Sequence, residues 1–445
     1  MYDTAPPDAT TLPASLNARL SFMMFLQYAI WGAWLPILYP FLLGHRGFSL
    51  DQVGMILAAG AVGAIFGPFI AGQVADRHFA TEKFLGISHL IGAALVWILA
   101  ATESFSVFLT VSLLYGLIYA PTLALTNSLC FHHLTDRDRQ FGPIRLWGTI
   151  GWIIAGIAVG QWLAYEHSPA DATGDALAAA WNVGRADAFR LSGLLGVIMG
   201  LYCYTLPHTP PATEARQANA TMEALGEAKR QPLLTLFLLA VPISVIHQFY
   251  FVHTSDFLSV LQSNVTAAKG FAEWIGDIFG VGGGGLMTVG QIVEIIVLAM
   301  IPLVAKRMSR KSLLALGIMA YAARMALFAY TDSIVTIMLG VALHGLCFGC
   351  FIFVAFMVVD EETTPDVRAS AQNLFNLVIV GIGIIVGSWF ATSIVGNWAS
   401  AGGAMDYTKL FSVPMWIAIA CLVILLIAYP GGRKQRAGEP GAATA

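Results

Sequence analysis

The stretch PHTPPATEARQANATMEALGEAKR, residues 207–230, divides this chain into two halves of similar length and character. The stretch is polar and contains prolines, whereas the chain on either side of it consists mainly of long apolar runs. A helix needs about 20 mostly apolar residues to cross a bilayer. Six runs of roughly that length precede the stretch and six follow it, so the sequence predicts twelve membrane-spanning helices.

The twelve runs have approximate limits at 17–42, 52–75, 83–101, 105–132, 141–165, 188–207, 232–261, 286–305, 311–331, 333–359, 367–396 and 409–430. Two sets of six spans joined by one polar connection are typical of secondary transporters. We therefore expect an all-α membrane protein with two six-helix bundles. The expected parts are an N-terminal tail 1–16, an N-terminal bundle 17–207, a linker 208–231, a C-terminal bundle 232–430 and a C-terminal tail 431–445.

The composition agrees with a membrane protein and excludes several other classes. Of the 445 residues, 57% are hydrophobic and only 11% are charged, against about 25% charged residues in soluble domains. The net charge of -3 and the absence of a basic run argue against nucleic acid as a partner. The five cysteines lie in apolar runs. No metal-ligand spacing and no catalytic constellation occurs, so we expect neither a metal, a cofactor nor an enzyme.

The basic residues predict the orientation in the membrane. Lysine and arginine concentrate in the connections on the same side as the linker and the C-terminal tail, for example at 306–311. Because such residues are retained on the inner side, both termini are expected in the cytoplasm and the protein in the cytoplasmic membrane. The opposite connections at about 166–187 and 262–285 are rich in Asp, Ala and Gly and are interpreted as outer loops.

A short motif occupies the connection between the second and third spans. The sequence GQVADRH, residues 72–78, contains Gly72, Asp76 and Arg77. It resembles the G-x-x-x-D-R motif of the major facilitator superfamily, in which a glycine permits close helix packing and the charged pair acts at the cytoplasmic face. The alternative interpretation is a merely basic cytoplasmic turn.

The eighth span carries two polar side chains in an otherwise apolar segment. In MTVGQIVEIIVLAM, residues 287–300, Gln291 and Glu294 are three residues apart and share one helical face. A carboxylate at the centre of a bilayer costs about 2.5–3.5 kcal/mol on insertion scales. Such a group can clamp two helices together, but it can also carry a proton, and we favour the proton-carrying role for Glu294.

Other spans carry polar and aromatic side chains at helical spacing. They are Arg145, Thr149 and Trp152 in the fifth span, Gln248 and Phe251 in the seventh, and His344 and Phe348 in the tenth. Arg145 can instead reach the cytoplasmic surface with its long side chain. We interpret His247 and His253 in the seventh span, and Arg324 in the ninth, as groups with structural partners.

Together these side chains suit a neutral ligand that has a flat ring and several hydroxyl groups. A ring stacks on Trp or Phe faces, and hydroxyls bond to Gln and Glu. A sugar or another polyol fits the same pattern. A membrane sensor on a transporter-like scaffold is a third interpretation, but the short tail after residue 430 offers no signalling domain.

Five segments resemble those of the bacterial nucleoside:H⁺ symporters of the nucleoside permease G type. They are FLQYAIWGAWL (25–35), GPIRLWGTIGW (142–152), GQIVE (290–294), ARMALFAYTD (323–332) and DVRASAQNLF (366–375). The resemblance implies the major facilitator fold and a central site for a nucleoside and a proton. It also implies that Arg145, Thr149, Trp152, Gln248, Gln291, Glu294 and Phe348 belong to this site.

The chain departs from the family pattern at three positions. Phe251 stands where the family has Asn, His344 where it has Tyr, and Gly349 where it has an Asp thought to join in proton coupling. We therefore expect Glu294 to carry the proton alone, or with help from His344. The expected function is nucleoside import by proton symport, and the alternative is an uncoupled nucleoside facilitator. The expected partners are a nucleoside, a proton and the lipid bilayer, and we expect a monomer.

Overall fold

The computed structural model describes residues 12–70, 79–211, 220–264, 270–364 and 367–430, and these residues fold into helices without any strand. Twelve helical segments are long and apolar enough to cross a membrane, as the sequence predicts. They fall into two sets of six, before and after the connection that contains α10 (Ala220–Glu227). The prediction of an all-α membrane protein with twelve spans is confirmed.

The N-terminal half contains α1 (Ala14–Trp34), η1 (Leu35–Ile37), α2 (Leu38–Pro40), η2 (Phe41–His45), α3 (Leu50–Ile70), α5 (Thr81–Ala101), α6 (Phe105–His133), α7 (Arg137–Glu166), α8 (Gly174–Gly184) and α9 (Ala186–Cys203). The first span changes from α-helix to the 3₁₀ turn η1 at Pro36, because a proline lacks the N–H group that a regular α-helix uses in its interior.

The C-terminal half contains α11 (Leu233–Asn264), α12 (Phe271–Phe279), α13 (Gly284–Val304), α14 (Arg310–Tyr330), α15 (Ile334–Ala342), α16 (His344–Leu346), η4 (Cys347–Phe353), α17 (Val354–Glu362), α18 (Arg368–Asn376), η5 (Leu377–Ile382), α19 (Gly383–Trp389), η6 (Phe390–Gly396), α20 (Asn397–Ala399) and α21 (Tyr407–Ala428). The tenth and eleventh spans change to π-helix at η4, η5 and η6. Such turns often occur at functional sites.

The interpretation of 166–187 and 262–285 as loops is wrong in part, since each contains a helix. The segment of α8 is rich in alanine, a strong helix former, and buries Trp181. The segment of α12 places Phe271 and Trp274 one turn apart and buries Ile275. Short helices with one apolar side are stabilised by tertiary packing, which composition alone does not show.

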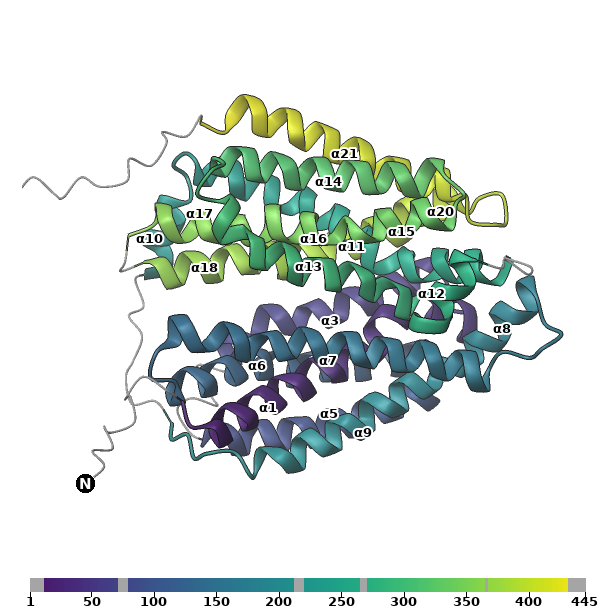
Figure 1. The fold of residues 1–445 in the computed structure, drawn as a ribbon, viewed down its shortest axis with the longest axis horizontal. Helices are drawn as coiled ribbons and strands as arrows, with labels where there is room; N and C mark the ends of the chain where they lie inside the picture. The colour runs from purple at the N-terminus through teal and green to yellow at the C-terminus, as the bar shows by residue number, and fades with distance from the viewer. Residues whose placement is uncertain (1–11, 71–78, 212–219, 265–269, 365–366, 431–445) are drawn as a thin grey trace, which may run out of the picture.

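Each half buries its own apolar core. One cluster of buried side chains runs from Leu20 to Leu206 and includes Val252, and the other runs from Leu233 to Tyr429. Figure 1 shows the helices of the N-terminal half below those of the C-terminal half. Large apolar side chains such as Leu238 and Leu303 remain exposed, as expected of helices whose outer faces meet lipid.

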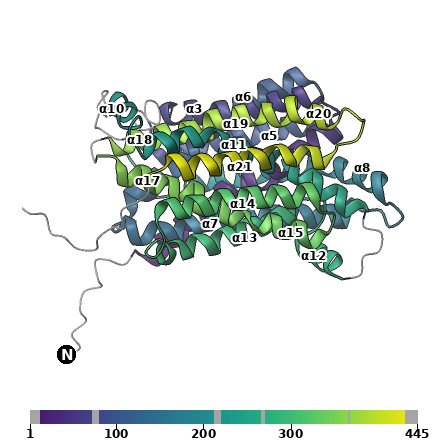
Figure 2. The same cartoon turned by 90° about the horizontal axis from the view of Figure 1, so that it is seen from above.

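The two halves meet along two pairs of helices. Helix α7 packs against α13, and α3 packs against α19 with its neighbouring π-helical segments. Seen from above, each of these pairs lies close together (Figure 2). The fold therefore places α7, which carries Arg145, Thr149 and Trp152, beside α13, which carries Gln291 and Glu294.

Hydrogen bonds link the halves at the end of the molecule that carries α8 and α12. Arg185 donates to Ser259 Oγ at 3.0 Å and to the Gly282 carbonyl at 3.1 Å. Gln161 donates to the Asp277 carbonyl at 2.7 Å. This end lies opposite α10 and α18 (Figure 1). The two halves are therefore joined at the end that the basic residues predict to be outside.

The motif residues Gly72, Asp76 and Arg77 lie outside the described residues. Their expected role at the cytoplasmic face stays a prediction.

Candidate functional site

The helix that carries Glu294 lies very close to the tenth span. A Cβ atom at Gly290 of α13 would lie 2.8 Å from His344 Cβ, and one at Gly345 of α16 would lie 2.6 Å from the carbonyl carbon of Val293. Neither position has room for a side chain. The two glycines therefore let α13 and α16 approach each other, and this approach brings Glu294 next to His344.

Glu294 is the acid of this site and lies between the two halves. Its Oε2 atom is 3.5 Å from His344 Nε2 on α16, and 14% of its side chain is exposed. From the other half, the Arg145 guanidinium on α7 interacts electrostatically with this carboxyl. Arg145 itself lies over the ring of Tyr28, 4.0 Å from the ring centroid. Arg145 therefore contacts an aromatic ring of its own half and interacts with a carboxyl of the other half.

His344 connects this acid to a buried arginine. Its Nδ1 atom is 3.1 Å from Arg324 NH1 on α14. Arg324 has no exposed surface, and its guanidinium lies 4.3 Å from the ring centroid of Tyr250 and 5.0 Å from that of Tyr321. Glu294, His344 and Arg324, which we call the charge cluster, therefore form a continuous chain of polar contacts across three helices.

Aromatic rings surround His344. Tyr250 stacks on it with centroids 4.7 Å apart, and His247 stacks on it at 5.4 Å. Two predicted site residues belong to the same set: Phe251 at 5.9 Å and Phe348, one turn along the span, at 6.5 Å. Phe251 and Phe348 therefore lie beside His344, which in turn contacts Glu294.

The two predicted glutamines differ in their bonding. Gln248 on α11 donates from Nε2 to Ser388 Oγ on α19 at 3.0 Å. Gln291 on α13 is buried, with 6% of its surface exposed, and its Oε1 atom has no hydrogen-bond partner. A buried amide oxygen without a partner loses about 1–3 kcal/mol relative to a bonded one. Of the two glutamines, Gln291 therefore has more to gain from a ligand that donates a hydrogen bond.

Thr149 and Trp152 are partly buried on α7, one and two turns beyond Arg145. Within the described part of the chain, no hydrogen bond or ring contact joins their side chains to the charge cluster. The structure brings together Arg145, Phe251, Glu294, His344 and Phe348 more closely than it does Thr149 and Trp152.

Arg324 lies closer to the candidate site than its expected structural role suggests. The partner of its guanidinium is His344, itself a candidate site residue. The signal in the sequence is the spacing of Tyr321 and Arg324, three residues apart on one face of α14. His253, by contrast, has its Nε2 atom 3.0 Å from the Ala391 carbonyl oxygen, as a structural histidine should.

Gly349 lies in the π-helical segment η4 and faces α13. A Cβ atom there would lie 2.6 Å from Val297 Cγ1. Gly349 therefore permits close packing between η4 and α13, and a side chain at this position would require Val297 to move.

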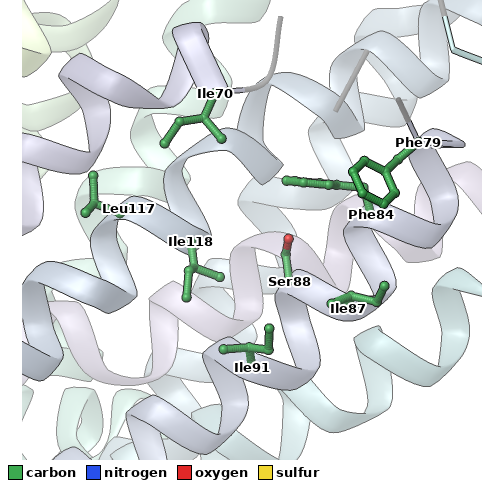
Figure 3. Close-up of a pocket in the computed structure, with 8 residues that line it drawn as sticks. All are labelled: Ile70, Phe79, Phe84, Ile87, Ser88, Ile91, Leu117 and Ile118. Atoms are coloured by element: carbon green, nitrogen blue, oxygen red, sulfur yellow. The ribbon is translucent and has the colours of Figure 1, made fainter. Parts of the chain in front are cut away.

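An apolar groove of about 350 Å³ lies elsewhere, among α3, α5 and α6. Figure 3 shows its lining, in which Ser88 offers the only side-chain oxygen. None of its lining residues belongs to the helices of the charge cluster. A ligand rich in hydroxyl groups would find a single side-chain partner, Ser88, in this groove. The described residues also contain no group of three or more His, Cys, Asp or Glu that could hold a metal ion.

Comparison with protein families identifies the chain. The family model described as nucleoside H⁺ symporter matches residues 14–433. The chain belongs to the nucleoside H⁺ symporter family. It is 32% identical to the putative nucleoside transporter YegT of Escherichia coli over 83% of this chain and 82% of that protein. It is 28% identical to the xanthosine permease of the same organism over 93% of this chain and 96% of that protein.

The fold agrees with this assignment. A crystal structure of a variant of the nucleoside transporter NupG superposes with a TM-score of 0.80 at 24% identity and covers 92% of this chain and 99% of that one. The resemblance inferred from the five sequence segments is confirmed. This member of the nucleoside H⁺ symporter family is a multi-pass membrane transporter and not an enzyme.

Proposed function

We propose that this protein imports nucleosides together with protons by alternating access, with the nucleoside held between its two halves and the proton held on Glu294. Membership of the nucleoside H⁺ symporter family supports the transport reaction. The observation that carries the proton site is the position of Glu294. This partly exposed carboxyl on α13 lies between a cation on α7 and a histidine on α16.

The proton site has a physical rationale. An ionisable group inside a membrane is costly and is kept where it works. A buried carboxyl is favoured in its neutral form by desolvation and in its charged form by a nearby cation. Because Glu294 has both influences, small changes in solvent access and in its distance from Arg145 shift the balance between the two forms. A rearrangement of the two halves can therefore load and release the proton.

The nucleoside contacts follow from the side chains around this carboxyl. The base stacks on Phe348 or Trp152, and the ribose hydroxyls bond to Gln248, Gln291 and Glu294. The partnerless Oε1 atom of Gln291 supports a hydroxyl donor at this point. Arg145 bonds a base carbonyl, or it pairs with Glu294 once the proton has left. Thr149, Phe251 and His344 complete the lining.

The movement is a rocking of the bundles 17–207 and 232–430 about this site. With both termini in the cytoplasm, the end that carries α8 and α12 faces outward. The bonds from Arg185 to Ser259 and Gly282 then close the outer side in this structure, and opening towards the outside requires that they break. The protein acts as a monomer in the cytoplasmic membrane.

The test is uptake of labelled uridine into vesicles that contain the protein, with and without an imposed proton gradient. We expect accumulation above equilibrium only when the outside is more acidic, and inhibition by unlabelled nucleosides but not by sugars. Uptake that does not depend on the proton gradient would indicate an uncoupled facilitator. Inhibition by sugars would contradict a site specific for nucleosides.

A further inference from the structure

We propose that Arg324, His344 and Glu294 act as one unit in which His344 never carries the transported proton. In this unit His344 is a neutral positioning residue. It accepts a hydrogen bond from Arg324 and offers its Nε2 proton to the ionised Glu294, so that one carboxyl binds one proton in each transport cycle. This inference rests on the proposed function of Glu294, but it concerns two residues to which that proposal gives no part in proton transfer.

The first observation is that Arg324 is a buried cation without a direct counter-charge. Its side chain has no exposed surface, and its Nε and NH2 atoms have no hydrogen-bond partner. Within the described residues, no carboxylate lies within ion-pair distance of it. The faces of Tyr250 and Tyr321 attract the charge but do not neutralise it. The closest polar route to a negative charge leads through His344 to Glu294.

The second observation fixes the protons on the His344 ring. A guanidinium has only donors and keeps its charge in proteins. The Nδ1 atom of His344, 3.1 Å from Arg324 NH1, must therefore be the acceptor in this contact. A neutral imidazole has one N–H, so its proton is on Nε2, the atom that faces Glu294 Oε2 at 3.5 Å. Protonation of Nδ1 would set two N–H groups against each other beside a fixed positive charge.

The third observation is the set of groups that surround the unit. The surrounding groups are Arg145 from α7 on the Glu294 side, Arg324 and Tyr321 from α14, His247 and Tyr250 from α11, and the thiol of Cys347 from η4 near Arg324. The Nδ1 atom of His247 is already 2.7 Å from the Tyr321 hydroxyl. The two arginines disfavour a third positive charge at His344. Glu294 is therefore the group of this cluster that changes charge.

These positions give the cycle an order. When Glu294 is ionised, it holds the Nε2 proton of His344 and balances Arg324. When a proton from the outer water binds the carboxylate, the negative charge disappears and the Nε2–H group is free to donate to an oxygen of the nucleoside. The proton thus prepares the site for the substrate. When Glu294 releases its proton to the inner side, the carboxylate again accepts a hydrogen bond from the Nε2–H group of His344.

Two near-isosteric variants separate the two bonds of His344. In His344→Gln, the amide nitrogen takes the place of Nε2 and keeps a donor for Glu294. In His344→Asn, the amide reaches only the place of Nδ1 and faces Arg324. Loss of a donor to the ionised form favours protonation, so the Asn variant should transport up to a pH about one unit or more higher than the wild type. The Gln variant should keep the wild-type pH dependence, although its apparent KM changes.

The measurement is the initial rate of proton-driven uridine uptake between pH 5 and pH 9 in proteoliposomes. His253→Gln is the matched control, because His253 is equally buried but contacts the Ala391 carbonyl, and its pH dependence should not move. Equal pH dependence of the Asn and Gln variants, or a shift in the Gln variant alone, would overturn the proposal. Uptake by the wild type that ignores the gradient would instead overturn the proposed proton symport.

A measurement on the wild type remains decisive if the variants fail to fold. Nitrogen-15 chemical shifts of the His344 ring distinguish the two neutral tautomers from imidazolium. We expect a proton on Nε2 and none on Nδ1 throughout the range from pH 5 to pH 9. A signal from imidazolium, or from a proton on Nδ1, would refute the positioning role whatever the transport results are.

Discussion

Two buried polar clusters, one in each half, show how differently the same kinds of side chain are used. In the N-terminal half, the Gln27 side chain donates to Thr122 Oγ1 at 2.8 Å and contacts His89 Nε2 at 2.9 Å. The backbone carbonyl of Gln27 accepts a hydrogen bond from the Tyr119 hydroxyl. In the C-terminal half stands the charge cluster of Glu294, His344 and Arg324 with Gln291 beside it.

The amide cluster around Gln27 contains no permanently charged group, and both ends of the Gln27 side chain are bonded, although the Nδ1 atom of His89 has no hydrogen-bond partner. The charge cluster contains a guanidinium with two partnerless nitrogens, and next to it a glutamine oxygen without a partner. A satisfied polar network fixes helices, whereas an incomplete one leaves energy to be gained from a ligand. The comparison teaches that an acid and a fixed cation close to a partnerless amide oxygen, rather than polarity alone, distinguish the candidate transport site.

The strongest test of the comparison is Glu294→Gln. The variant keeps the shape of the side chain but cannot bind and release a proton. We expect complete loss of accumulation driven by a proton gradient, while exchange of labelled for unlabelled uridine across the membrane persists. Both are measured in the same proteoliposomes, and full gradient-driven accumulation by the variant would remove Glu294 from the mechanism.

A smaller effect is expected for Gln291→Ala. The variant removes the partnerless oxygen that we assign to a ribose hydroxyl. Loss of one such hydrogen bond is worth about 1.5 kcal/mol, so the apparent KM for uridine should rise about tenfold. For a substrate that lacks the ribose hydroxyl, the apparent KM should differ less between the variant and the wild type. An unchanged KM for all substrates would show that Gln291 does not contact the nucleoside.

The smallest effect on transport is expected for Gln27→Leu, which removes the centre of the amide cluster. Thr122 and His89 lose their partner, and the stability should fall by about 1–3 kcal/mol. Thermal unfolding in detergent should therefore begin at a lower temperature. The pH dependence of uptake per folded molecule should match the wild type. A shifted pH dependence would mean that the N-terminal cluster also takes part in proton coupling, and the contrast between the clusters would fail.

Much of the fold could be predicted from the sequence, because membrane helices are set by local composition. A run of about 20 apolar residues leaves no stable alternative to a helix in lipid, so all twelve spans could be counted. The helices α8 and α12 were missed, since they are short and depend on packing. The π-helical segment that holds Phe348 was missed for a related reason, because it depends on the contacts of a span rather than on its hydropathy.

The candidate site was only partly predictable. Spacing placed Gln291 and Glu294 on one face of a helix and singled out Arg145 and Phe348, which the resemblance to the nucleoside symporters then assigned to the site. The part played by Arg324 could not be deduced, because its contact with His344 joins residues on different helices. The absence of an acid at Gly349 was visible in the sequence, but the packing of Val297 against that position was not.

The sequence by itself determined the number of spans, the division into two halves, the family and the acid that stands in the eighth span. Each of these depends on which residues follow one another along the chain. Only the tertiary structure decided that Glu294 faces His344, that His344 accepts from Arg324, and that Gln291 keeps an oxygen without a partner. The physical reason is that a hydrogen bond depends on distances of about 3 Å between atoms. Such distances are set by how closely helices approach, here through Gly290 and Gly345.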